Sequence, residues 1–246
     1  MGELRVRSVL VTGANRGIGL GFVQHLLALP NPPEWVFAGC RDPKGQRAQV
    51  RLGWDAAEVG DSRAAAGVGM CEGLHHGAAA PDLRHRRAAV GCLLLSKETC
   101  PPNKFLCACF SFPSPQAFLP LLKKAAQGSP GSGMSCSKAA IVNISSNGGS
   151  IKEVYLWEGI QAACYRCSKA ALNMLTRCQS MGYREHGIFT VALHPGWVQT
   201  DLGSEGGAKP PLTVDASVGG MMKVLSKLSE KDSGTFLDWE GNVVAW

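Results

Sequence analysis

The sequence predicts an α/β fold in which helices cover both faces of a parallel sheet. Short apolar runs rich in β-branched residues, at 5–12, 139–145 and 189–194, have the length and composition of buried strands. Segments with apolar residues at helical spacing occur at 17–29 and 161–185. Strands that alternate with helices in this way indicate a parallel, doubly wound sheet.

The composition agrees with a globular domain and excludes several other classes of protein. The 246 residues are 45% hydrophobic and 18% charged, which excludes a disordered, collagenous or coiled-coil chain. No apolar stretch reaches the roughly 18 residues of a membrane helix, and the N-terminal residues do not have a signal-peptide pattern. Ten cysteines without a secretion signal indicate free thiols in a reducing compartment, so we expect a cytoplasmic protein without a membrane partner. The net charge of +6 is spread along the chain rather than clustered, so we expect no nucleic-acid partner.

Both ends of the chain can be divided into elements in order. The first strand, 5–12, is followed by the helix 17–29, which prolines terminate, and by a second strand at 35–40. In the second half, Ser114-Pro115 is typical of a helix start, and Pro120 is expected to kink that helix. The remaining elements expected there are helices at 114–127, 161–185 and 213–228, and strands at 139–145, 189–194 and 235–237.

Residues 50–113 do not fit this pattern. No isoleucine lies between Ile18 and Ile141, and the segment is rich in alanine, arginine, glycine and histidine. A doubly wound domain needs two strands and two helices here, but only 88–95 is a credible strand. We therefore expect a single domain over 1–246 in which strands 3 and 4 are doubtful and 50–113 is anomalous, with disorder as one interpretation.

A glycine-rich turn, TGANRGIG, connects the first strand to the first helix. Its glycines, spaced G-x-x-x-G-x-G, allow a sharp turn and a close approach to a pyrophosphate at the helix N-terminus. In its strand–turn–helix context the turn predicts a Rossmann-like dinucleotide site. Arg41 at the end of the second strand, together with Arg16, favours NADP(H) over NAD, because arginine accommodates a 2′-phosphate. The alternative is that both arginines are solvated surface residues.

A second group of residues could carry proton-transfer chemistry. Ser145 and Ser146 end a buried strand, while Tyr165 and Lys169 lie four apart on the following helix and so share one face. A free tyrosine has a pKa near ~10, and a nearby ammonium lowers the pKa by stabilising the phenolate. The phenol could then give a proton to a carbonyl oxygen as hydride reaches the carbon.

Taken together, TGANRGIG, NISS, YRCSK and HPGWVQTD resemble the short-chain dehydrogenase/reductase family. The phrases NPPEWVFAGCRDP, QAFLPLLKKAA and GTFLDWEGN resemble more narrowly its C-factor or sniffer-like carbonyl reductase branch. The resemblance covers 1–49 and 114–246. It implies an NADP(H)-dependent oxidoreductase that transfers hydride between nicotinamide and a small-molecule carbonyl or alcohol, and family members often form homo-oligomers.

The resemblance also implies roles for individual residues. Tyr165 would be the general acid, Lys169 would hold the nicotinamide ribose and lower the tyrosine pKa, and Ser146 would orient the carbonyl. The other residues implied in cofactor binding come from the glycine turn, the second strand end and the segment after the strand at 189–194: Gly13, Asn15, Arg16, Gly17, Ile18, Gly19, Arg41, Pro195, Gly196, Val198 and Thr200.

The chain departs from the family pattern in the anomalous segment. The Asn-Asn-Ala-Gly signature after the fourth strand has no counterpart, and no asparagine can be assigned to the family's proton relay. One alternative is therefore a family variant that is catalytically impaired or inactive, and a weaker one is a nucleic-acid-binding protein that uses its scattered basic charge. The pairs Cys107-x-Cys109 and Cys164-x-x-Cys167 do not have the spacing of a zinc site, so no metal is expected.

Overall fold

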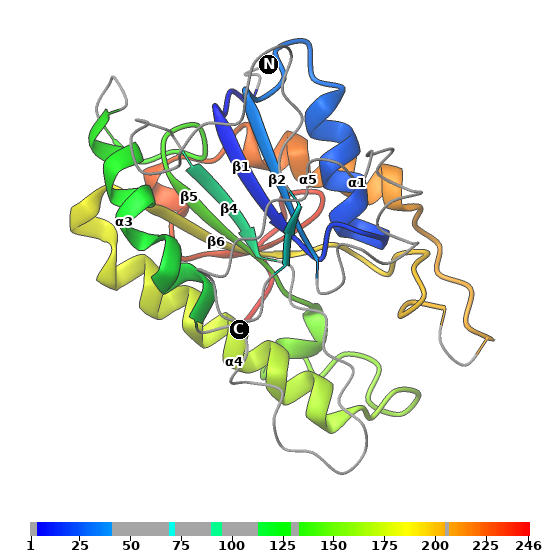
Figure 1. Cartoon of the computed structure of the whole chain (residues 1–246). Coiled ribbons are helices and arrows are strands. Elements are labelled where there is room, and N and C mark those ends of the chain that lie inside the picture. Colours follow the sequence, from blue (N-terminus) through cyan, green and yellow to red (C-terminus); the bar gives the residue numbers. More distant parts are fainter. Residues whose placement is uncertain (1–3, 41–68, 72–89, 95–112, 129–132, 205–206) are drawn as a thin grey trace.

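The computed structural model describes residues 4–40, 69–71, 90–94, 113–128, 133–204 and 207–246. Seven strands in these residues form one sheet with the order β3-β2-β1-β4-β5-β6-β7. Helices cover both faces of the sheet (Figure 1). The α/β, doubly wound fold expected from the sequence is therefore confirmed.

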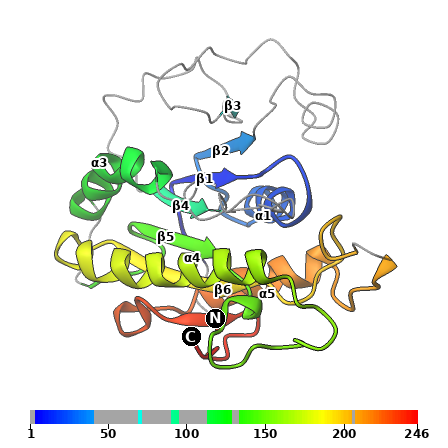
Figure 2. The same cartoon turned by 90° about the horizontal axis from the view of Figure 1, so that it is seen from below.

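The central strand β1 (Ser8–Thr12) pairs in parallel with β2 (Trp35–Cys40) on one side and with β4 (Val90–Leu94) on the other. Parallel pairing continues from β4 through β5 (Ala140–Ile144) and β6 (Phe189–His194) to β7 (Phe236–Asp238). Figure 2 shows most of this order from below.

The anomalous segment contributes two strands to this sheet. The expected strand at 88–95 forms as β4, between β1 and β5, so the doubt about this strand was wrong. A further strand, β3 (Gly69–Cys71), was not predicted and pairs antiparallel to β2 at the sheet edge. An antiparallel edge strand on an otherwise parallel sheet is common in doubly wound folds. The rest of 50–112 lies outside the described residues.

The helices form two layers. On one face, α1 (Gly17–Leu27) packs against α5 (Val214–Leu225). On the other, α3 (Pro113–Gly128) and α4 (Ala163–Gly182) cover β4 and β6 (Figure 1). The helix α3 continues through Pro120, which lies inside it on the exposed side. Short 3-10 helices complete the fold: η2 (Asn147–Gly149), η3 (Arg184–His186) and η5 (Glu230–Asp232).

Side chains alternate between two hydrophobic clusters along the central strands, as the two-residue period of a strand requires. In β1, Val9 and Val11 face the cluster under α1 and α5, whereas Leu10 faces the cluster that includes Leu122 of α3. Burial on both faces explains why β1 and β5 are continuous apolar runs in the sequence. No helix among the described residues is long and apolar enough to cross a membrane.

One glycine sets the distance between two helices. A Cβ on Gly21 of α1 would lie 2.7 Å from Cγ1 of Val214 and 3.0 Å from Cγ2 of Val218, both on α5. The two helices therefore pack as closely as they do because residue 21 has no side chain. This contact fixes the position of α1, whose N-terminus carries the glycine-rich turn.

Candidate active site

The glycine-rich turn ends at the N-terminus of α1, beyond the end of β1. Gly13 and Gly17 have φ angles of +64° and +53°, which residues with a Cβ rarely adopt. The N–H of Ala14 donates to the carbonyl oxygen of Gly39 at 3.1 Å, which joins the turn to β2. Asn15 and Ile18 are half-buried in this turn, while Gly19 is buried in α1.

The N-terminus of α1 has properties that suit an anion. Arg16 is the N-cap residue and makes no side-chain capping hydrogen bond, and the first turn of the helix contains no acidic residue. The leading backbone N–H groups of a helix lack intrahelical partners and carry partial positive charge. The turn could therefore hold a phosphate group by these N–H groups, with the Arg16 guanidinium beside them.

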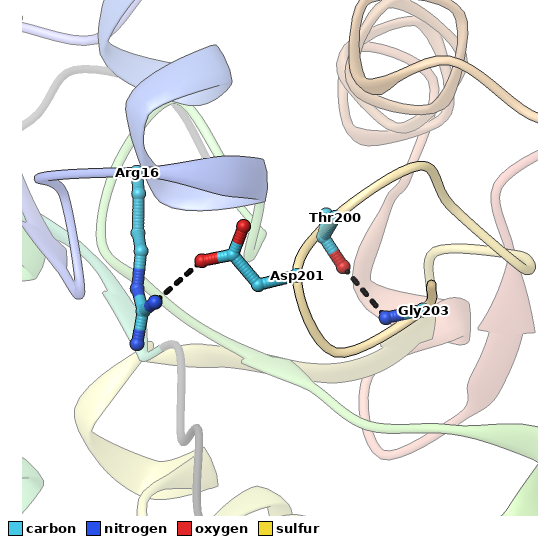
Figure 3. Close-up of polar contacts among 4 residues, drawn as sticks. All are labelled: Arg16, Thr200, Asp201 and Gly203. Carbon is cyan, nitrogen blue, oxygen red and sulfur yellow. Dashed lines mark hydrogen bonds and ion pairs between the residues drawn. The ribbon is translucent and has the colours of Figure 1, made fainter. Parts of the chain in front are cut away.

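The segment that follows β6 contacts this turn. Arg16 Nη1 donates to Asp201 Oδ2 at 2.5 Å, and Thr200 Oγ1 accepts from the backbone N–H of Gly203 at 3.1 Å (Figure 3). A Cβ on Gly17 would lie 3.4 Å from Cγ2 of Thr200. Residues almost two hundred positions apart in the chain are thus neighbours on the two sides of the candidate cofactor site.

The other predicted residues of this segment have structural partners. Gly196 has a φ of +82°, and a Cβ there would lie 2.8 Å from Cδ2 of Leu212. The carbonyl oxygen of Pro195 accepts from Ser217 Oγ at 2.6 Å. Val198 is buried and forms a β-bridge with Leu212. These contacts fix the backbone that leads from β6 to Thr200.

Ser145 and Ser146 lie directly after β5 and have different hydrogen-bond partners. Ser145 Oγ donates to Asn173 Oδ1 at 2.5 Å, which attaches the strand end to α4. Ser146 is the N-cap residue of η2, and its Oγ accepts from the N–H of Gly148 at 3.1 Å. A Cβ on Gly148 would lie 3.3 Å from both Ser146 Oγ and Tyr165 Cε1, so the two side chains border the same turn. Ser146 and Tyr165 therefore lie near each other across Gly148.

Lys169 is buried on the same face of α4 as Tyr165. Its Nζ donates to the carbonyl oxygen of Ile144 at 3.0 Å and lies 5.8 Å from the centroid of the Tyr165 ring. The ammonium thus sits over the ring and is anchored to the end of β5. The three residues Ser146, Tyr165 and Lys169 form one cluster at the carboxyl end of the sheet.

The expected direction of the Tyr165 pKa differs from what the structure gives. Burial of the half-buried ring raises the pKa above 10, because desolvation disfavours the phenolate. The hydrogen bond from Ser146 and the positive charge of Arg166 oppose this shift and do not overcome it. Burial therefore has the larger effect in this structure, and the lowering of the Tyr165 pKa by Lys169 stays a prediction. Tyr165 is a protonated donor at neutral pH.

Sequence reasoning missed one residue of this site. Asn173 lies one helical turn beyond Lys169, and its Nδ2 donates to the carbonyl oxygen of Gly149 at 3.2 Å while its Oδ1 accepts from Ser145. It thereby holds the turn that carries Ser146. The spacing Tyr165, Lys169, Asn173 repeats every four residues along one helical face, and this signal could have identified it.

Two glycines allow η2 to lie against α4. A Cβ on Gly148 would lie 3.3 Å from Cε1 of Tyr165, and a Cβ on Gly149 would lie 2.7 Å from the backbone carbonyl carbon of Lys169. The turn therefore approaches the helix backbone at the position of the lysine.

Arg41 and the residues after β4, where the Asn-Asn-Ala-Gly signature would stand, lie outside the described residues. Among the residues that are described, no cluster of His, Cys, Asp and Glu could hold a metal ion.

Comparisons with known proteins agree with this geometry. The family model for short chain dehydrogenase matches residues 117–210. The C-signal of Myxococcus xanthus is 48% identical over 85 residues, which are 35% of this chain and 49% of that protein, so the matched segment spans about half of it.

Two solved structures are similar over nearly the whole chain. The NADPH-bound carbonyl reductase from chicken fatty liver is 54% identical, with a TM-score of 0.80, and the match covers 100% of this chain and 96% of that one. The carbonyl reductase Sniffer of D. melanogaster is 31% identical, with a TM-score of 0.73, over 98% and 100% of the two chains. With this identity over almost complete lengths, the chain belongs to the short-chain dehydrogenase family.

Proposed function

We propose that the protein is an NADP(H)-dependent carbonyl reductase that transfers hydride between nicotinamide and a small-molecule carbonyl or alcohol. The observation that carries the proposal is the cluster of Ser146, Tyr165 and Lys169 at the same sheet edge as the glycine-rich turn. Similarity to two carbonyl reductases of known structure supports the same activity.

The residues at the turn fit a phosphorylated dinucleotide. The α1 N-terminus has no capping side chain and no acidic residue in its first turn, and Gly13 and Gly17 add no side chains of their own to the turn. The half-buried guanidinium of Arg16, which pairs with Asp201 in this structure, supplies a positive charge for a 2′-phosphate. The likeness to a carbonyl reductase with bound NADPH supports this choice of cofactor. In this proposal Asn15, Ile18 and Gly19 line the pyrophosphate side, and Pro195, Gly196, Val198 and Thr200 line the nicotinamide end.

The chain's own residues supply proton transfer and orientation. When bound, NADPH supplies the hydride and leaves as NADP⁺. Ser146 Oγ, whose position η2 fixes, hydrogen-bonds the carbonyl oxygen and turns the carbon toward the cofactor side. The Tyr165 hydroxyl gives its proton to that oxygen, so the C=O double bond becomes an alcohol. Water then returns a proton to the phenolate, and the buried Lys169 ammonium stabilises this negative charge while it exists.

A thermal-shift measurement with NADPH, NADH and buffer alone tests the cofactor assignment. We expect NADPH to raise the Tm more than NADH, because Arg16 favours the 2′-phosphate and because binding to the folded state stabilises it. No shift with either nucleotide would contradict the proposal, and equal shifts would contradict the role of Arg16.

Replacing Tyr165 by Phe tests the chemistry. We expect Tyr165→Phe to lower kcat for NADPH-dependent aldehyde reduction at least about 100-fold, the usual contribution of a positioned general acid, with the NADPH Kd almost unchanged. Tyr183, on the far end of α4, supplies the matched control Tyr183→Phe, which should retain activity. Retained turnover in Tyr165→Phe would remove this residue from its assigned role.

The chief alternative is a family member that binds cofactor without turning over substrate. The sequence feature that favours it is the missing Asn-Asn-Ala-Gly signature. A Tm increase with NADPH, combined with no reduction of any aldehyde or quinone tested, would support it.

We further propose that residues 1–246 act as one domain and that the protein is cytoplasmic. The free thiols of Cys136, Cys164, Cys167 and Cys178 support the cytoplasmic location.

A further inference from the structure

An unusual concentration of exposed apolar side chains lies in the segment of the chain that connects Ser146 with Tyr165. The segment 151–162, which we name the apolar flap, connects η2 with α4 and so lies between Ser146 and Tyr165. Figure 1 shows it in light green beside the N-terminal end of α4. Six of its large hydrophobic side chains are exposed, namely Ile151, Val154, Tyr155, Leu156, Trp157 and Ile160. Exposed apolar side chains concentrated in this way commonly mark a binding surface.

The flap backbone does not have a relaxed conformation. Val154, Leu156 and Ala162 have φ angles of +39°, +53° and +30°. These are the non-glycine residues with positive φ among those that the structure describes, and all of them lie in the flap. Residues with a Cβ persist in this region only where surrounding contacts hold them, so the flap needs an external constraint.

Arg166, the neighbour of Tyr165 in the first turn of α4, supplies this constraint. Its Nη2 donates to the carbonyl oxygens of Tyr155 at 2.6 Å and Ile160 at 2.7 Å, and its Nε donates to that of Gln161 at 3.0 Å. The guanidinium carbon also lies 5.7 Å from the centroid of the Trp157 ring, within the range of a cation–π contact. One side chain therefore binds the flap at four points along its length.

The start of the flap has a second attachment. The N–H of Lys152 donates to the carbonyl oxygen of Trp246 at 3.0 Å, and the N–H of Glu153 donates to Ser150 Oγ at 3.1 Å. The Trp246 ring stacks on Phe236 of β7 with centroids 5.4 Å apart. The first residues of the apolar flap are thus attached to the sheet through Trp246, and the apolar part of the flap, from Tyr155 to Gln161, depends on Arg166.

We propose that Arg166 is a positioning residue that holds the apolar flap beside Tyr165, so that the flap forms the wall against which the apolar part of the substrate packs. The inference rests on the proposed function. It assigns a substrate class, aromatic or extended aliphatic carbonyl compounds, in preference to small or polar ones. Burial of an apolar group against the flap stabilises the bound substrate roughly in proportion to the area removed from water.

Arg166→Lys tests the positioning role because lysine keeps the positive charge near Tyr165 but cannot reach three carbonyl oxygens with a planar fork. Arg177→Lys is the matched control, since Arg177 lies on the same helix and binds the carbonyl oxygen of Gly234, away from the flap. The first readout needs no activity. Chymotrypsin cleavage after Tyr155, Leu156 or Trp157, followed by mass spectrometry, should become at least tenfold faster in Arg166→Lys and stay at the wild-type rate in Arg177→Lys.

The second readout is selectivity between 2-naphthaldehyde and propanal. We expect Arg166→Lys to lower the ratio of their kcat/KM values at least tenfold, mainly through a higher KM for 2-naphthaldehyde, while the NADPH Kd stays within twofold. Trp157→Ala is a second variant that keeps the carbonyl hydrogen bonds of Arg166. It should lower the same ratio without faster cleavage of the flap.

The outcomes separate this inference from the proposed function. Unchanged flap cleavage in Arg166→Lys would overturn the positioning role, whether or not the protein reduces aldehydes. Faster cleavage with an unchanged selectivity ratio would overturn the substrate wall. A wild-type protein that reduces neither aldehyde would contradict the proposed function and the substrate class together, and the cleavage rates would still decide whether Arg166 holds the flap.

Discussion

His194 should make the stability of the protein depend on pH. It is the last residue of β6 and pairs in register with Asp238 of β7. Burial lowers its pKa from 6.5 to about 4, the Asp238 carboxylate opposes this shift, and the Lys169 ammonium adds to it. Its Nδ1 is buried without a hydrogen-bond partner among the described residues. The folded protein therefore holds His194 neutral in a place where a charge is unfavourable.

The sign of the effect follows from proton binding in the two states. Because the pKa is lower in the folded state, the unfolded state binds more protons between pH 6.5 and about 4. The contribution of neutral His194 to the free energy of unfolding is complete above pH 6.5 and is lost as the pH falls toward 4. Each unit of difference between the two pKa values is worth about 1.4 kcal/mol of stability. The loss is therefore about 3 kcal/mol in total, of which about 2 kcal/mol is lost by pH 5.

Urea denaturation at several pH values between 7.5 and 5 measures this dependence. The wild-type free energy of unfolding should fall over that range by about 2 kcal/mol more than that of His194→Gln, which cannot titrate. The difference between the two proteins isolates His194, because all other titrating groups are common to both. Parallel curves, or a wild type that becomes relatively more stable in acid, would refute the reasoning.

Two further predictions concern close contacts at the candidate site. Gly149→Ala would place a Cβ 2.7 Å from the backbone of Lys169, so we expect a loss of about 1–3 kcal/mol in urea denaturation and lower reductase activity. Gly159→Ala, where no atom lies within 4 Å, is the control and should change stability by less than about 0.5 kcal/mol; equal effects in the two variants would contradict the contact. Asp201→Asn frees Arg16 from an exposed ion pair of about 1 kcal/mol or less, so calorimetry should find NADPH binding up to about fivefold tighter and NADH binding unchanged. Weaker NADPH binding would mean that Asp201 orients Arg16 instead of competing for it.

The elements that the sequence predicted well are those whose burial fixes their composition. β1, β5 and β6 are buried on both faces, and their apolar β-branched runs state this directly. Helix ends also matched to within a few residues. The helix expected from 213 begins at Val214, and Thr213 caps it, because its Oγ1 accepts from the N–H of Ala216. Local chemistry was sufficient in these cases because a buried strand or a helix cap needs a particular residue type.

The elements that the sequence did not predict depend on contacts outside themselves. β3 spans only Gly69–Cys71, too short for any periodicity, and it exists as an antiparallel partner of an edge strand. The pKa of Tyr165 was predicted from its spacing to Lys169 alone, whereas burial by the surrounding fold sets its direction. A spacing of four residues predicts that two helical side chains lie close together, but it does not predict how far the titrating group is removed from water.

The register of the central strands explains how an anomalous segment can still support a site. Val11, Leu93, Val142 and Val191 lie in one row across β1, β4, β5 and β6. Gly13 follows this row by two residues, and Ser146 follows it by four, so both leave the sheet at the same edge. With strands about 4.8 Å apart, β4 holds β1 and β5 about 10 Å from each other. Four residue pairs on each side of β4 are enough for this spacing, because backbone hydrogen bonds do not depend on side-chain identity. The separation between the candidate cofactor turn and the candidate catalytic serine therefore follows from the presence of β4 rather than from the residues that usually follow it.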